Sequence, residues 1–524
     1  MSQQSNIAVI GAGPGGLAAA MLLAASGCDV TIFEAQARAG GRSRRLAIDD
    51  FQFDIGATFF MMPYVMDEIF RAANRHLVNE VEMTRLDPMY RLVFNSGNSV
   101  DLEVDALPDQ VQMMRQLDAI CPGDGQAFER FMQDNRLKLA SMDPILRRPI
   151  RSMRDLFDRK ALGALKHLHP GRTMYKHLSK YFADPRIRLA MGFQSKYLGM
   201  SIYECPSLFS ILPFIEYEYG VWHPQGGIAS TMDAMARIST EMGVKIHLNS
   251  PVEQILFNGR RATGVCVDGV NHEFDQVVVN ADATWAMKNL IPGSLRKRYS
   301  DEKIDRMGYS CSTYMLYLGI RGELPLPHHT ICFSEKYQEN LADITHHGRL
   351  SEEPSMYFCN PSCTDPSMAP VGCASLYCLV PTPNTKSGIN WKAEAPRLRR
   401  QVIDQLGRRL GISDIESRII AEHQITPADW QAQNINHGAT FNLAHSLKQM
   451  LGRRPQHRLE DVDGVWLVGG GTHPGSGLPV ILLSSQITTD LICKEVGIPW
   501  AGSGSSINSS TSSASQLQDL LVPS

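Results

Sequence analysis

The chain has 524 residues, and its 51 basic and 54 acidic side chains nearly cancel. Such a balance argues against a nucleic-acid-binding protein, whose affinity comes from a basic surface, so no nucleic-acid partner is expected. The eleven cysteines are scattered without a CxxC pair, so no metal site is predicted, and the thiols fit a reducing compartment. The length exceeds that of one simple core and predicts two or more intertwined domains.

A dinucleotide-binding βαβ unit is predicted at the start of the chain. An apolar strand, a glycine-rich turn, a helix and a second strand follow one another at residues 7–10, 11–16, 17–26 and 29–33. In this motif Gly11 permits the tight turn, Gly13 lets a diphosphate approach the backbone, and Gly16 lets helix and strand pack closely. Glu34, 18 residues after Gly16, can accept hydrogen bonds from ribose hydroxyls and disfavours a 2′-phosphate. The alternative is a glycine-rich turn without a ligand, which the flanking strand and helix disfavour.

A second pair of glycines follows this unit directly. Gly40, Gly41 and Arg42 resemble the GG-R extension of glutathione-reductase-like and amine-oxidase-like flavoproteins. There the glycines admit the diphosphate of FAD and the arginine neutralises it, whereas Arg42 in another context would be a solvated surface charge. Residues 54–58 resemble the D-x-G segment of the same superfamily. The resemblance therefore predicts FAD, with further contacts from Gly56, Ala57 and Thr58.

The middle of the chain is expected to return to the nucleotide-binding fold. Residues 220–227 are rich in glycine and precede a predicted helix, and strands are predicted at 245–248, 251–255 and 276–279. In the flavoproteins named above, a valine in such a strand meets the adenine through its backbone, which points to Val252. The alternative is that Val252 is simply a core residue of a strand.

A second glycine-rich loop lies near the C-terminus. A strand at 465–468 leads into the loop at 469–479, and a helix follows from about 480 to 496. Glycines bring backbone N–H groups close to a cofactor, and the helix presents its positive end to negative charge, which in related flavoproteins is on the reduced flavin. The alternative is a tight turn into a packed helix. The cofactor-binding residues predicted here are Gly470, Gly471, Thr472, Gly477 and Leu478.

With these motifs the chain resembles a known family, the bacterial carotenoid desaturases of the phytoene and diapophytoene type. The most specific piece is the Gly-Thr-His-Pro-Gly stretch at 471–475, and residues 220–227, 360–370 and 379–384 support it. The sequence of residues 475–479 looks more like that of the family branch that includes aldehyde-forming oxidases. The resemblance implies an apolar polyene substrate, FAD as hydride acceptor, and dioxygen or a quinone as final oxidant.

The predicted fold class is α/β, with a discontinuous Rossmann-like FAD-binding domain, an α+β substrate domain and a helical membrane-facing subdomain. The FAD-binding domain is expected from residues 1–104, 220–308 and 446–498. Residues 105–219 are expected to form the helical subdomain and 309–445 the substrate-binding sheet domain. The serine-rich residues 499–524 are expected to be a flexible tail.

A membrane surface is a predicted partner. Residues 136–180 carry twelve Lys or Arg and three acidic residues. A helix starting at Pro149 would place Ile150, Met153 and Phe157 on one face, so it could lie on an anionic membrane. The alternative is an ordinary solvated face. No signal peptide and no run of ~18 apolar residues is found, so the expected location is cytoplasmic, peripheral on the inner face of the membrane.

The sequence leaves the catalytic base open. His473 is a candidate because imidazole titrates near neutrality, but a role in bracing the loop is favoured, since a base must first show geometric reach. Glu216 and Glu218 are weaker candidates. Two other functions stay open on this fold: a non-catalytic prenyl or lipid carrier, and an amine-oxidase-like flavoenzyme. A lysine near the flavin and an aromatic cage would support the last, and the sequence shows neither clearly.

Overall fold

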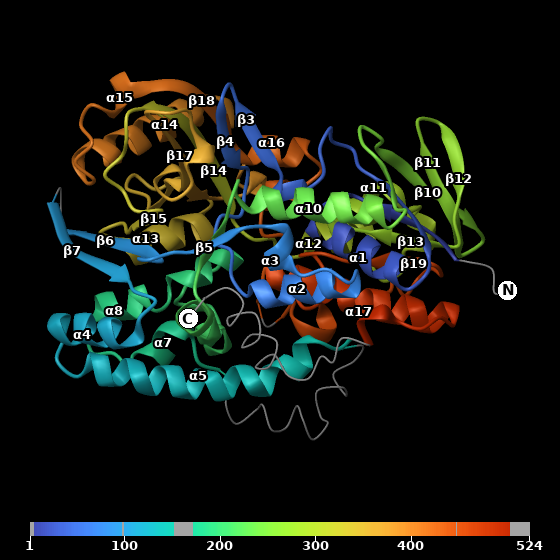
Figure 1. Ribbon diagram of the computed structural model, residues 1–524, viewed down its shortest axis with the longest axis horizontal. Coiled ribbons are helices and arrows are strands. Elements are labelled where there is room, and N and C mark those ends of the chain that lie inside the picture. The colour runs from blue at the N-terminus through green and yellow to red at the C-terminus, as the bar shows by residue number, and fades with distance from the viewer. Residues whose placement is uncertain (1–4, 97–98, 151–170, 447, 504–524) are drawn as a thin grey trace.

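The computed structural model describes residues 5–96, 99–150, 171–446 and 448–503. Two sheets, one near each end of the molecule, are joined along one side by a layer of helices (Figure 1). This arrangement matters for function because residues from all three parts meet at one cavity.

A parallel sheet of five strands forms one half. In spatial order its strands are β19 (Val465–Leu467), β13 (Gln276–Val279), β1 (Asn6–Ile10), β2 (Asp29–Phe33) and β9 (Lys245–His247). Each neighbouring pair is parallel. The strands come from three distant stretches of the chain, which confirms the predicted discontinuous nucleotide-binding fold.

Both faces of this sheet are covered. Alternate side chains of a strand point to opposite faces: Ile7 and Val9 face one apolar core, and Ala8 and Ile10 face another. The apolar run at the start of the chain is therefore continuous because it is buried on both sides. The first face is covered by α1 (Pro14–Ala25), α10 (Ile228–Glu241) and α17 (Leu478–Val496). The second is covered by β10 (Val252–Asn258), β11 (Arg261–Val267), β12 (Val270–Glu273) and α11 (Ala283–Leu290).

A mixed sheet of seven strands forms the other half. Its order is β18 (Ile419–Ile425), β14 (Ser312–Arg321), β17 (Cys373–Thr382), β16 (Met356–Cys359), β15 (His329–Cys332), β6 (Tyr90–Ser96) and β7 (Ser99–Ala106). On β14, Leu316 and Leu318 face α14 (Trp391–Arg408), whereas Met315 and Tyr317 face the hairpin of β3 (Arg45–Ile48) and β4 (Phe51–Asp54).

The division of the chain into the predicted domains stays a proposal. β6 and most of β7 lie within residues 1–104, yet both strands join the second sheet, because β6 pairs with β15 and β7 pairs with β6. The nucleotide-binding sheet itself takes only β1 and β2 from that part of the chain.

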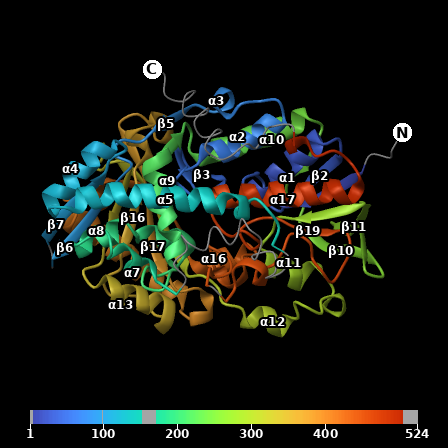
Figure 2. The ribbon, with the colours of Figure 1, turned by 90° about the horizontal axis from the view of Figure 1, so that it is seen from below.

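The helical layer runs along one side of the molecule. Its longest helix, α5 (Asp124–Leu146), extends across much of the molecule (Figure 2). The layer also holds α4 (Gln110–Ile120), α7 (Met174–Leu178), α8 (Pro185–Ala190) and α9 (Ile211–Tyr219). Most of the basic helix predicted to start at Pro149 lies in residues 151–170, outside the described residues. Among the helices that the structure describes, none has the length and apolar character needed to cross a membrane.

Smaller elements complete the described chain. The strands β5 (Met83–Arg85) and β8 (Trp222–Pro224) form a two-stranded ribbon. The remaining helices are α2 (Pro63–Ala72), α3 (Leu77–Glu80), α12 (Asp301–Arg306), α13 (Tyr337–Ala342), α15 (Ile415–Arg418) and α16 (Pro427–Ala432).

Candidate active site

A cavity of about 600 Å³ reaches both sheets and the helical layer. At one end its wall is made of the turns that follow β1, β2 and β19; at the other it is made of apolar side chains from α5, α9 and the second sheet. We call these the cofactor half and the substrate half. Of the sixteen residues predicted above to bind the cofactor, all line this cavity except Gly16, Gly40 and Thr472.

Gly16, Gly40 and Thr472 lie outside the cavity lining and support the loops that form it. A Cβ on Gly16 would lie 2.0 Å from the Gly11 carbonyl oxygen. A residue with a side chain at position 16 would therefore prevent helix α1 from packing this closely against β1. A Cβ on Gly40 would lie 2.9 Å from the Cα of Arg44. The Thr472 hydroxyl donates to the Gly469 carbonyl at 2.8 Å. Each of the three therefore supports the cavity wall without forming part of it.

The first glycine turn is held by a side chain that the motifs do not include. Asn280, directly after β13, donates from Nδ2 to the Gly11 carbonyl at 3.1 Å. A Cβ on Gly13 would lie 3.0 Å from that nitrogen, and one on Gly15 would lie 2.5 Å from Asn280 Oδ1. Asn280 follows a parallel strand at its carboxyl end, where ligands of such sheets bind, and this position is the signal that could have identified it.

Glu34 is buried at the carboxyl end of β2. Its Oε2 accepts a hydrogen bond of 2.6 Å from the Ala12 backbone N–H, and its Oε1 accepts one of 2.9 Å from Gln36. The carboxylate therefore fastens the glycine turn and lines the cavity. Val252, the first residue of β10, lines the cavity as well.

The D-x-G segment and the glycines at 226–227 come together in space. Both carboxylate oxygens of Asp54 accept 2.9 Å hydrogen bonds from the first backbone N–H groups of α10, at Ile228 and Ala229. Burial raises the pKa of Asp54 to about 6, although these two donors act in the opposite direction. Asp54 thus anchors the start of the segment that carries Gly56, Ala57 and Thr58 to the cavity wall.

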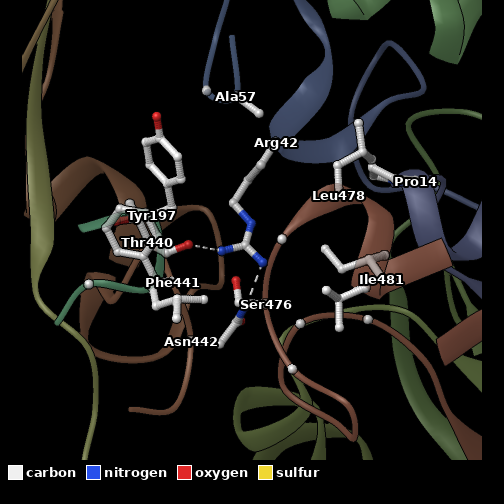
Figure 3. Close-up of a pocket in the computed structure, with 18 of the residues that line it drawn as sticks. Pro14, Arg42, Ala57, Tyr197, Thr440, Phe441, Asn442, Ser476, Leu478 and Ile481 are labelled. Atoms are coloured by element: carbon white, nitrogen blue, oxygen red, sulfur yellow. Dashed lines mark hydrogen bonds between the residues drawn. The ribbon is translucent and has the colours of Figure 1, made fainter. Parts of the chain in front are cut away.

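Arg42 brings a positive charge into the cofactor half (Figure 3). Its guanidinium donates to the Thr440 carbonyl and, at 3.3 Å, to Asn442 Oδ1. Burial lowers its pKa, an effect partly offset by the charge of Asp282. Among the described residues no carboxylate lies within 4.0 Å of its nitrogens. A half-buried cation with only neutral partners favours an anionic ligand, and a diphosphate supplies that charge.

The second glycine loop closes the cofactor half. Gly469, Gly475 and Gly477 have φ values of 107°, 149° and 118°, which side chains with a Cβ rarely adopt. Helix α17 starts directly after Gly477, and no side chain caps its first N–H groups. These groups and the positive end of a 19-residue helix therefore lie beside the cavity, where Gly477 and Leu478 form part of the wall.

Arg454 holds this loop from inside the protein. It is completely buried, and its guanidinium donates to the carbonyls of Thr472 at 3.0 Å and Gly470 at 2.6 Å. Burial lowers its pKa to about 10. No motif in the sequence pointed to Arg454, because its partners are backbone carbonyls that only the folded chain brings to it.

His473 contacts the helical layer. Its Nε2 donates to the Arg148 carbonyl at 3.2 Å, just beyond the end of α5, and burial lowers its pKa to about 4. The imidazole is therefore neutral near pH 7 and a weak base. The contact ties the glycine loop to α5, which is what the bracing interpretation expects.

The two glutamates of α9 differ in environment. Glu216 is completely buried, and its Oε2 accepts hydrogen bonds of 2.8 Å from Tyr90 and from Gln194. Burial raises its pKa to about 7 against the effect of these donors. Glu218 forms an ion pair of 2.6 Å with Arg136. Neither glutamate lines the cavity.

The substrate half is apolar. Its wall includes Leu139, Met142, Ile145 and Leu146 of α5, and Ile211, Leu212 and Ile215 of α9. Phe59, Phe193, Tyr197 and Tyr357 add aromatic rings. The acidic side chains among the described lining residues are Glu34 and Asp282, both in the cofactor half. This half therefore suits a long uncharged molecule.

Comparison with known proteins agrees with this geometry. A family model described as flavin containing amine oxidoreductase matches residues 14–489. The chain is 40% identical to a 4,4'-diapophytoene desaturase (4,4'-diapolycopene-forming) of Methylomonas sp over 94% of this chain and 96% of that protein. It is 35% identical to a zeta-carotene-forming phytoene desaturase of Myxococcus xanthus over 99% and 98% of the two chains.

Solved structures show the same fold. An oxidoreductase from Methanosarcina mazei has a TM-score of 0.62 at 17% identity, covering 93% of this chain and all of that one. The cyclohexylamine oxidase of Brevibacterium oxydans has a TM-score of 0.58 at 17% identity, covering 94% and 100%. The chain therefore belongs to the flavin containing amine oxidoreductase family, as an FAD-dependent oxidoreductase similar to bacterial diapophytoene and phytoene desaturases.

Proposed function

We propose that the protein is an FAD-dependent desaturase of a long apolar polyene in carotenoid biosynthesis. The observation that supports this best is the single cavity, in which glycine loops from both ends of the chain adjoin an apolar half without carboxylates. The relatives are named as desaturases of such polyenes. Bound FAD would supply the hydride acceptor for this chemistry.

We assign the residues of the cofactor half as follows. The backbone at Gly11, Gly13 and Gly41 would hold the diphosphate, and Arg42 would neutralise it. Glu34 would accept hydrogen bonds from the ribose, and Val252 would contact the adenine. The loop residues Gly470, Gly471, Gly477 and Leu478, with Gly56, Ala57 and Thr58, would adjoin the flavin.

The substrate half would orient the polyene and exclude water. Desaturation removes a hydride from an allylic carbon and a proton from its neighbour. Until the proton leaves, positive charge lies on the chain, and the rings of Phe59 and Tyr197 can stabilise it through their faces. Phe59 and Tyr197 lie 5.1 Å apart between ring centroids. We assign no base: His473 braces the loop, and Glu216 lies behind the wall.

The two other functions are less well supported. An amine substrate is cationic near neutral pH, yet the described wall of the substrate half offers it no carboxylate. A carrier without redox chemistry has no need of an FAD site, whereas the glycine loops and the half-buried Arg42 fit FAD. We therefore retain the desaturase.

The final electron acceptor and the location are also proposals. Dioxygen or a quinone would reoxidise the flavin. Because a polyene dissolves in the bilayer, we infer that the protein works as a peripheral protein at the inner face of the membrane, from the cytoplasm. Co-sedimentation with anionic and with neutral vesicles tests this, and equal absence of binding to both would contradict it.

Co-expression tests the proposed reaction. The gene is expressed in cells that accumulate phytoene or diapophytoene, and the pigments are analysed. We expect products with a longer conjugated system in at least one strain, and loss of these products with the Arg42→Met variant. Unchanged pigments in every strain, with the flavin-loaded protein present, would contradict the desaturase.

A further inference from the structure

Lys196 places a single basic side chain in the wall of the substrate half. It belongs to a 3-10 helix, Phe193–Leu198, which also contributes Phe193 and Tyr197 to the wall. The other basic residues that line the described cavity, Arg42 and Arg44, belong to the cofactor half. Lys196 is therefore not one of the proposed diphosphate contacts.

An aromatic ring lies beside the amine of Lys196. Its Nζ lies 4.9 Å from the ring centroid of Tyr337 in α13. The Tyr337 ring in turn packs 5.0 Å from Phe333. Leu341 and Ile344, which follow Tyr337 along the chain, line the cavity. The contact with Tyr337 is a cation–π interaction, which offsets only part of the cost of removing an ammonium group from water.

The amine has no anionic partner among the described residues. In the part of the chain that the structure describes, no carboxylate lies within 4.0 Å of Nζ. Cys311 is near, but burial raises the pKa of its thiol, which therefore stays neutral. Burial lowers the pKa of Lys196 to about 8, so most of the amine is still protonated at pH 7. A positive charge thus borders an otherwise apolar part of the cavity.

We propose that Lys196 forms a polar subsite that binds the carboxylate at the end of a long apolar chain. The inference rests on the proposed function, since it names a further class of ligand for the same substrate half. A carboxylate fits better than a phosphate ester, because one amine matches one negative charge and no arginine or glycine loop lies with it. The protein would then accept polyenes whose end has already been oxidised to the acid.

The size of the effect follows from the chemistry of the pair. A charge-assisted hydrogen bond formed out of water is stronger than a neutral one. We expect an acid to bind about ten- to a hundredfold more tightly than a ligand of the same shape without the charge. A hydrocarbon polyene makes no such bond, so its affinity depends on the apolar wall alone.

The experiment compares all-trans-retinoic acid with its methyl ester, which differ in charge but hardly in shape. Binding of both to the FAD-loaded protein is measured by equilibrium dialysis for four proteins: the native chain, Lys196→Met, Lys196→Arg and Lys245→Met. Lys245 is a matched control because its side chain is 60% exposed and does not line the cavity. Retained flavin absorbance shows that each variant is folded.

We expect the native protein and Lys245→Met to prefer the acid at least tenfold, Lys196→Arg to keep part of the preference, and Lys196→Met to bind both ligands equally. An equal affinity of the native protein for acid and ester, or an acid preference that survives in Lys196→Met, overturns the proposal. Desaturation of phytoene or diapophytoene by the native protein is measured in parallel. Turnover without acid preference refutes the subsite alone, and acid preference without turnover refutes the desaturase alone.

Discussion

The two halves of the cavity are built by different means. The cofactor half is mainly backbone: turns with positive φ at Gly11, Gly469 and Gly477, and the start of α17. The substrate half is mainly side chains, brought from α5, α9 and the second sheet. A ligand held by backbone requires glycine at particular places, so it leaves a local motif. A ligand held by packed side chains leaves none, because many apolar residues can fill the same space.

The strongest test of the backbone half is Gly16→Ala. The added Cβ would lie 2.0 Å from the Gly11 carbonyl oxygen, so α1 must move away from β1. We expect a loss of unfolding free energy of about 3 kcal/mol or more, the upper part of the usual cost of overpacking, with loss of bound FAD. The matched control is Gly407→Ala, also in a helix, where the new Cβ has no atom closer than 3.6 Å. Equal stability and equal flavin content of the two variants would contradict this reading of the turn.

The helix α9, which lines the substrate half, can be tested through Glu216 and the pH dependence of the unfolding free energy. Burial raises its pKa from 4.5 to about 7, so between these values the unfolded chain releases a proton that the folded protein keeps. The contribution of Glu216 is therefore complete below pH 4.5 and is lost as the pH rises through 7, on the order of 3 kcal/mol in total.

The measurement is urea unfolding at pH 5 and at pH 7 for the native protein and Glu216→Gln. Asp54 acts in the same direction because burial raises its pKa as well, and the difference between the two proteins isolates Glu216. We expect the native protein to lose more stability than the variant over this interval. An equal change in unfolding free energy in the two proteins would show that the buried carboxyl group titrates as it does in water.

Arg42→Met tests whether the half-buried cation binds the diphosphate. Loss of a charge-assisted contact should weaken FAD binding about ten- to a hundredfold. The affinity is measured by titrating flavin-stripped protein with FAD and following flavin fluorescence. Arg38→Met is the control, because Arg38 is exposed on the preceding turn. If Arg42→Met binds FAD as tightly as Arg38→Met does, the guanidinium has another role.

The smallest effect is expected for His473→Asn. If the imidazole only ties the loop to Arg148, polyene turnover should fall a few-fold and its pH profile should keep its shape. A general base typically contributes about a hundred- to ten-thousandfold. A loss of that size, together with loss of one limb of the pH profile, would show that His473 acts as a general base.

The same contrast explains what could be predicted from the sequence. The strand, glycine turn and helix at the start of the chain, and the similar group near the C-terminus, are local in sequence and lie at one cavity as expected. Arg454 and Lys196 could not be found in this way, since their roles depend on carbonyls and rings that only folding brings near. The same holds for β6, whose partner β15 lies more than two hundred residues further along the chain.

The most direct test of the whole account is a single turnover without oxygen. The FAD-loaded protein is mixed anaerobically with phytoene or diapophytoene in vesicles, and the oxidised flavin band near ~450 nm is followed together with the polyene spectrum. We predict that the flavin band bleaches while a more conjugated polyene appears in equal amount. A flavin that stays oxidised with both substrates, in protein that binds FAD fully, would contradict the proposal that the two halves of the cavity act on one reaction.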